Sequence, residues 1–272
     1  MAIISISRHQ SALGDETARA LSKTLNYLLV DRQNLEEQMK TYGSLSNIDI
    51  EKFDERKPIL FAGLTQAPDY YLHFLKTAMF NHAIKGNCIF VGRGASFVFH
   101  SLPGLVSVHL SAPIDIRIER VKGYFHCDER RARQLIEQRD ADKAGFIRYF
   151  FGSEWNELTN YQLCLNTGQL NPDACAIIIK SLMDQVMTEE VVTLHNKALK
   201  DMFLGHTIEH QILFERNVQI SFLEARVDDQ NITLFGVAQS HALVAAALGI
   251  ADDFKEHRQV QSEIQVIQEP LN

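Results

Sequence analysis

The stretch that decides the fold is "SISRHQSALGDETARALSKTL", residues 5–25. An apolar run, residues 2–6, leads into it, and its second half carries Ala18, Leu21 and Leu25 at helical spacing. A strand, a tight loop and a helix N-terminus form an anion site, because the first amide N–H groups of a helix are unpaired and lie at the positive end of its dipole. The sequence therefore predicts a site that resembles a phosphate-binding loop.

The composition of this loop differs from that of a typical phosphate-binding loop. Gly14 is its only glycine, Ser11 and Thr17 are the nearby hydroxyls, and the expected lysine is absent. Asp15 and Glu16 occupy the first helical turn instead. Acids stabilise an empty helix end by about 0.3–1 kcal/mol each and oppose a bound triphosphate. Two interpretations stay open here, a nucleotide site or a helix N-terminus that binds nothing.

The rest of the chain divides into two patterns. Apolar strands alternate with helices over residues 1–188, which predicts an α/β domain with a parallel sheet covered by helices on both faces. The strands are expected at residues 2–7, 27–30, 87–92, 105–111 and 161–166. Residues 189–272 read as helix, two hairpin strands, a helix capped by Ser240, and a last strand. That order predicts a small α+β (αββαβ) domain.

Composition excludes several classes of protein. The net charge of −7 argues against a general nucleic-acid binder, and no apolar run is long enough to predict a membrane span. The N-terminus lacks a signal-peptide pattern, so we expect a cytoplasmic protein. Cys88, Cys164 and Cys175 lie in apolar stretches and are expected to act as small hydrophobes. No spacing of histidines or cysteines predicts a metal site.

Several segments, in this order, resemble the cytidylate kinase-like family of P-loop nucleoside-monophosphate kinase relatives. They are "ISISRHQSALGDETARAL", "GNCIFVGRGASFVF", "VHLSAPIDIRIERV" and "NYQLCLNTGQL", within residues 2–186. The resemblance implies a P-loop kinase-like fold and phosphoryl transfer to a nucleoside monophosphate. It also implies ATP and Mg²⁺ as cofactors if the protein is active.

The resemblance also implies roles for individual residues. Those expected to bind nucleotide are Arg8, Ser11, Gly14, Thr17, Asp31 and Arg93. Arg139 and Lys143 lie one helical turn apart in a segment that resembles the kinase lid, and they would neutralise the transferring phosphoryl group. Arg93 could equally form a structural salt bridge, and the lid segment could be a plain solvated helix.

Three positions depart from the family pattern. Leu13 replaces a glycine, Asp15 replaces a basic residue, and Gln162 replaces an aspartate. These departures predict that phosphoryl transfer is impaired or altered. The alternative is a non-catalytic protein that senses a nucleotide or binds a partner.

The second domain resembles a BON-like domain over residues 190–268, on the pattern "NITLFGVAQSHALVAAALGIADDF" followed by "SEIQVI". This resemblance implies partner binding, homodimer formation or small-ligand sensing. The segment has no basic patch that would attract anionic lipid.

Overall fold

The computed structural model describes residues 1–41 and 67–267. The chain divides into two compact units, Met1–His195 and Asn196–Asn272, and the division falls within helix α8 (Glu189–His210). Within the described ranges, every helix is too short or too polar to cross a bilayer. Each unit is described by itself below.

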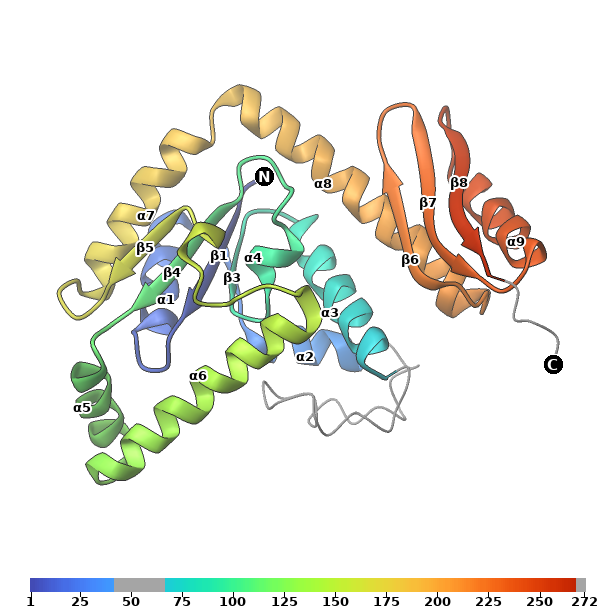
Figure 1. Ribbon diagram of the computed structural model, residues 1–272. Helices are drawn as coiled ribbons and strands as arrows, with labels where there is room; N and C mark the ends of the chain where they lie inside the picture. Colours follow the sequence, from blue (N-terminus) through green and yellow to red (C-terminus); the bar gives the residue numbers. More distant parts are fainter. Residues whose placement is uncertain (42–66, 268–272) are drawn as a thin grey trace. The chain divides into compact units, whose positions relative to one another are not determined.

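The first unit is built on a five-stranded parallel sheet (Figure 1). Its strands are β1 (Ile3–Arg8), β2 (Leu28–Val30), β3 (Cys88–Val91), β4 (Val106–Ser111) and β5 (Leu163–Asn166). They lie in the order β2-β3-β1-β4-β5. The predicted α/β class, a parallel sheet with helices on both faces, is confirmed.

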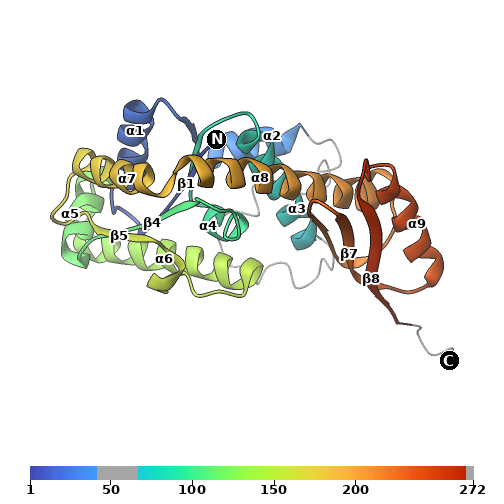
Figure 2. The ribbon, with the colours of Figure 1, turned by 90° about the horizontal axis from the view of Figure 1, so that it is seen from above.

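The two faces of this sheet differ in character. Helices α1 (Gly14–Leu25) and α7 (Pro172–Val186) cover an apolar face that includes Ile4, Ile6 and Val108. Helices α4 (Ala95–Val98) and α6 (Glu129–Phe151) lie on the other side (Figure 2). Because side chains alternate along a strand, this second face carries buried polar residues, namely Ser5, Ser7, Ser107 and His109.

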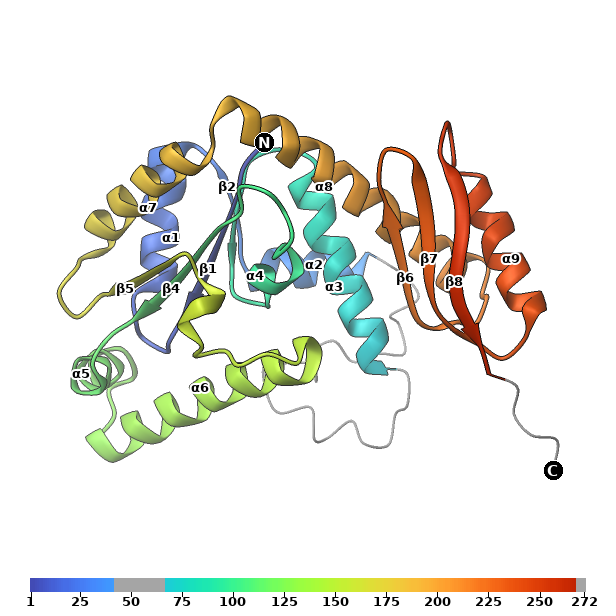
Figure 3. The same cartoon turned by 45° about the horizontal axis from the view of Figure 1, so that its top comes forward.

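Helix α6 lies along the carboxyl ends of the strands (Figure 3). It is the last part of an excursion that leaves β4, forms α5 (Ile114–Phe125) and returns through Trp155 to β5. Asp128 begins α6 as an N-cap, because its carboxylate accepts a hydrogen bond from the Arg131 amide at 2.7 Å. The remaining helices of the unit are α2 (Arg32–Lys40) and α3 (Ala67–Ala83).

The second unit contains a three-stranded sheet with helix α9 on one face (Figure 1). Strands β6 (Ser221–Val227) and β7 (Asn231–Ala238) form an antiparallel hairpin, and β8 (Gln259–Val266) pairs in parallel with β7. Ser240 caps α9 (His241–Asp252), as the sequence predicts. The helix contains Gly249 and ends three residues after it, at Asp252.

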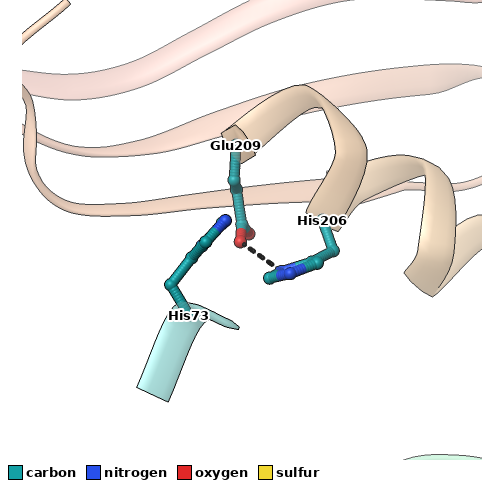
Figure 4. A group of neighbouring side chains, drawn as sticks. All are labelled: His73, His206 and Glu209. Carbon is teal, nitrogen blue, oxygen red and sulfur yellow. Dashed lines mark hydrogen bonds and ion pairs between the residues drawn. The ribbon is translucent and has the colours of Figure 1, made fainter. Parts of the chain in front are cut away.

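The end of α8 is joined to the sheet of the second unit by Glu209. Its carboxylate accepts a hydrogen bond from the Ala225 amide at 2.9 Å and lies 3.2 Å from His206 Nδ1 (Figure 4). His210 lies 3.5 Å from a different acid, Glu215. Within this unit, His206 and His210 therefore each pair with an acid of their own.

The cysteines follow the sequence expectation only in part. Cys88 and Cys175 are buried among apolar side chains, whereas Cys164 is exposed. Cys164 lies on β5, which is the edge strand of the sheet, so the apolar run around it is covered less than that of a central strand.

Candidate functional site

The loop between β1 and α1 keeps a tightly wound backbone without the usual glycines. Ser11 and Leu13 both have left-handed backbone angles, with φ of 60° and 54°. Such angles cost a residue with a side chain about 1–2 kcal/mol relative to glycine. Ala12 between them is fully buried in the core, so its small side chain fixes the middle of the loop. The loop therefore retains the required shape at a cost in backbone strain.

The side chain of Arg8 lies across two glycines. A Cβ on Gly14 would be 2.3 Å from Arg8 Cγ, and a Cβ on Gly92 would be 2.3 Å from Arg8 Nη1. Its other terminal nitrogen, Nη2, lies 3.2 Å from the Asp15 carboxylate. Arg8 thus spans from the start of α1 to the end of β3.

Helix α6 is hydrogen-bonded to this loop through Asp140. One carboxylate oxygen accepts from the Gln10 amide at 2.7 Å, and the other accepts from Arg117 at 2.5 Å. Lys143 donates to the Arg8 carbonyl at 3.2 Å and lies 3.8 Å from Asp140. The loop and α6 are therefore in direct contact in this structure.

The two lid residues predicted from the resemblance occupy different environments. Lys143 is buried next to the loop, with its ammonium 5.7 Å from the centre of the Trp155 ring. Arg139 is exposed, and its guanidinium lies 6.0 Å from the centre of the Phe125 ring. Only Lys143 of this pair reaches the loop.

Arg93, the residue expected to bind the acceptor phosphate, is paired with an acid. Its guanidinium is almost fully buried and donates to the Glu36 carboxylate at 2.8 Å. The same carboxylate oxygen accepts from Arg32 at 2.6 Å. Asp31 begins α2 through a reciprocal capping box with Asn34. The salt-bridge interpretation of Arg93 is therefore realised in this structure.

A small cavity lies between these groups. Its volume is about 30 Å³, and it is lined by residues that include Ser7, Arg8, Arg93, Ser96 and Lys143. That volume holds one or two water molecules. Three cations thus line this space together with apolar side chains such as Phe146 and Ile147, and the space must widen before it can admit a phosphate.

Below the loop, Ser7 accepts hydrogen bonds from a buried aromatic cluster. Trp155 Nε1 donates to its hydroxyl at 2.8 Å, and the Tyr161 hydroxyl, which donates to the Trp155 carbonyl at 2.9 Å, lies 3.2 Å from it. His109 Nδ1 lies 3.2 Å from the same oxygen, and His109 Nε2 lies 3.2 Å from His9 Nδ1. These contacts join the start of the loop to the segment that follows α6.

Burial sets the charge of the two histidines in this cluster. It lowers the pKa of His109 to about 4, and it also lowers the pKa of His9. Both imidazoles are therefore neutral near pH 7. Only a protonated His9 could attract an anion to the loop, and burial disfavours that charge state.

Two further sequence positions lie away from the open side of the loop. Thr17 is fully buried on the core-facing side of α1, so its hydroxyl is not open to the loop. Gln162 accepts from the amide and hydroxyl of Ser107, at the amino end of β4. This departure from the family pattern therefore lies at the amino ends of the strands, whereas the loop lies at their carboxyl ends.

Sequence reasoning missed three residues that hold the site together. Glu36 pairs with Arg93, Arg117 pairs with Asp140 of α6, and Arg120 donates to the Ser11 carbonyl at 3.0 Å. The spacing of Arg32 and Glu36 was a signal for an ion pair within the helix. The sequence carried no comparable signal for the contacts between distant segments.

Comparison with known proteins agrees with this architecture. A model of the cytidylate kinase-like family matches residues 3–169. The chain belongs to the cytidylate kinase-like family. The match covers the first unit as far as β5 and does not reach the second unit.

Curated relatives include cytidylate kinases from two archaea. The enzyme of Sulfolobus acidocaldarius is 31% identical over 102 residues, which cover 37% of this chain and 55% of that enzyme. The enzyme of Methanopyrus kandleri is 28% identical over 116 residues, which cover 40% of this chain and 60% of that enzyme. The chain thus spans little more than half the length of these relatives.

A solved structure shares the fold. A protein of uncharacterised function from Eubacterium ventriosum aligns with a TM-score of 0.51 and 19% identity, covering 68% of this chain and 99% of that one. At this identity the likeness shows the architecture alone.

Proposed function

We propose that the first unit binds a nucleotide at the carboxyl end of its parallel sheet and transfers phosphate slowly or not at all. We infer two nucleotide ligands from membership of the cytidylate kinase-like family. ATP is the phosphoryl donor, and a nucleoside monophosphate is the acceptor. Ligands of open α/β sheets bind at this end of the strands. The roles of Arg8, Ser11, Gly14, Asp31 and Arg93 in binding are part of the proposal.

The proposal that phosphoryl transfer is impaired rests on one observation. Four cations near the loop and cavity each contact a carboxylate: Arg8 with Asp15, Arg93 with Glu36, and both Arg117 and Lys143 with Asp140. Phosphoryl transfer depends on cations that stabilise developing negative charge, and one such donor contributes about 2.7–4 kcal/mol. Cations that are already held in ion pairs have less of this stabilisation to offer.

A coupled assay tests this function. The full chain is incubated with Mg-ATP and CMP, dCMP, UMP or AMP, and we expect turnover well below about 1 s⁻¹, the low end for ordinary enzymes. Titration calorimetry with CMP tests binding separately, and we expect Arg93→Ala to abolish it. Turnover above this level would contradict the impairment, and absence of CMP and ATP binding at millimolar concentration would contradict the nucleotide site.

In this proposal, Mg²⁺ is bound by ATP and reaches the site as the Mg-ATP complex. Thr17 does not offer its hydroxyl at the loop, and Asp15 is paired with Arg8. We therefore assign no residue of this chain as a Mg²⁺ ligand. Lys143 remains the proposed catalytic cation, and Arg139 could take part only if the lid moved.

A second candidate function, partner binding by the second unit, is favoured by strand β8. β8 is an edge strand of eight residues that contains neither lysine nor proline, the residues that commonly protect such edges. A groove of about 520 Å³ runs beside it, lined by His241, Val244, Ser262, Ile264 and Val266. We propose a second copy of this chain as the occupant, in a cytoplasmic homodimer with a BON-like second unit.

The sequence of β8 suits antiparallel pairing with itself. If the two-fold axis passes through Ser262, Val260 lies opposite Ile264 and Gln261 lies opposite Glu263, so apolar side chains meet and no like charges do. Light scattering of the full chain, with Ile264→Lys as the variant, tests this pairing. If light scattering still showed a monomer after a 100-fold increase in protein concentration, the pairing would be contradicted.

A further inference from the structure

Two glycines from different elements lie under one arginine. Gly14 begins α1 and Gly92 follows β3, yet a Cβ on either would overlap the Arg8 side chain at 2.3 Å. Glycine at these positions leaves room for the arginine stem and guanidinium. The Arg8 guanidinium lies beside Gly92, and Arg8 lines the small cavity together with Arg93.

Asp15 occupies the position at which the family usually has a basic residue. Its carboxylate lies 3.2 Å from Arg8 Nη2. A cation therefore reaches this position after all, although it comes from the end of β1 instead of the start of α1. The acid that occupies the position holds that cation in an ion pair.

We propose that Arg8 is the phosphate-binding cation of this loop and that Asp15 competes with the phosphate for it. The inference rests on the proposed function, because the ligand is the polyphosphate tail of a nucleotide. Asp15 then acts as an internal competitor, and binding exchanges its carboxylate for a phosphate oxygen.

The exposure of the two partners makes this exchange feasible. The side chain of Arg8 is 20% exposed and that of Asp15 is 59% exposed, so the pair is screened by water on the Asp15 side. Exposed pairs of this kind contribute little, whereas a guanidinium binds a phosphate through two parallel hydrogen bonds. A polyphosphate can therefore displace the carboxylate, at a cost of only a few fold in affinity.

The neighbouring acid provides a matched control. Glu16 lies on the same helical turn, is exposed, and lies 3.9 Å from Arg19. Glu16→Gln removes the same charge from the same turn as Asp15→Asn while leaving the Arg8–Asp15 pair in place. The two variants separate direct competition from the general electrostatic field.

Titration calorimetry of the full chain with ATP and with inorganic tripolyphosphate tests the proposal. Asp15→Asn is expected to raise the affinity for both ligands about three- to fivefold. This factor corresponds to the upper range of the free energy that an exposed ion pair contributes. Glu16→Gln is expected to change both by less than about twofold. Arg8→Ala is expected to weaken both by about tenfold or more, and Arg8→Lys to restore part of the loss.

Three results would overturn the proposal. The first is an equal gain in ligand affinity from Asp15→Asn and from Glu16→Gln. The second is unchanged or tighter ligand binding by Arg8→Ala. The third is that Asp15→Asn binds neither ligand. If Arg8→Ala does not fold, Arg8→Lys and the two acid variants still decide the question. Binding of tripolyphosphate without binding of ATP would refute the nucleotide function and leave the role of Arg8 intact.

Discussion

Arg93 and Glu36 form a nearly buried ion pair that joins the end of β3 to α2, with 2.8 Å between the guanidinium nitrogen and the carboxylate oxygen. Glu36 also pairs with Arg32, so a single carboxylate holds a buried and an exposed arginine. Because Arg93 lies in a left-handed backbone conformation, with φ of 53°, the ion pair helps to hold a strained turn.

Glu36→Gln should lower the free energy of unfolding by about 2 kcal/mol, because hydrogen bonds to charged groups contribute about 1.5–3 kcal/mol. Urea unfolding measures the change. The control is Glu37→Gln, one residue along the same helix, where the exposed carboxylate accepts only from Gln33 among the contacts seen here. That control should stay within about 0.5 kcal/mol. Equal losses in the two variants would show that the Arg93 pair adds nothing.

Ser7→Ala should cost about 1–3 kcal/mol, because it leaves the buried Trp155 indole N–H without its acceptor. Trp155 is the single tryptophan of the chain, so its fluorescence follows the unfolding of this cluster directly. Ser5→Ala is the control on the same strand and face, since Ser5 bonds one hydroxyl, that of Ser96 at 2.8 Å. A larger loss in Ser5→Ala than in Ser7→Ala would contradict the central role of Ser7.

The architecture could be predicted from local signals. The apolar residues around Ile4 and the spacing of Ala18 and Leu21 predicted β1 and α1, because strand and helix periodicity are properties of neighbouring residues. Ser240 predicted the start of α9 for the same reason, since an N-cap acts within one helical turn.

The candidate site depended on contacts that sequence spacing does not encode. Trp155 and Ser7 are 148 residues apart, and Gln10 and Asp140 are 130 apart. The spacing of Arg139 and Lys143 placed both on one helical face, yet only one lies close enough to the loop to bond it. The direction of the Arg8 side chain depends on two glycines that meet only in the folded sheet.

Leu13→Gly should be nearly neutral for stability, because it relieves about 1–2 kcal/mol of left-handed strain and loses a half-buried side chain. Leu25→Gly is the matched control, since Leu25 is also half-buried but is the last residue of α1, where glycine is unfavourable. We expect Leu25→Gly to be less stable than Leu13→Gly by about 2 kcal/mol in urea unfolding. Equal losses would show that the loop is not strained at Leu13.

Stability should fall as the pH drops from about 6.5 to about 4, because His109 is kept neutral by burial. Its pKa is lowered to about 4 in the folded chain, so the unfolded chain binds the proton first and is favoured in this range. Neighbouring groups act on the same pKa: His9 and Lys143 lower it, and Asp140 raises it. The full effect is on the order of 3 kcal/mol. In urea unfolding, His109→Gln should lose less unfolding free energy than the unmodified chain as the pH falls. The exposed His100→Gln should lose as much as the unmodified chain.

Gly14→Ala tests whether the room above Gly14 is needed by Arg8. The added methyl group would overlap the arginine stem at 2.3 Å, so Arg8 must leave Gly92 and Asp15 or α1 must shift. We expect a loss of about 1–3 kcal/mol, typical of an overpacked site. Gly123→Ala is the control, since its Cβ would point into open space on α5 and should add up to about 1 kcal/mol of helix stability. If Gly14→Ala were as stable as Gly123→Ala and bound tripolyphosphate as the unmodified chain does, Arg8 could not lie across Gly14 in solution.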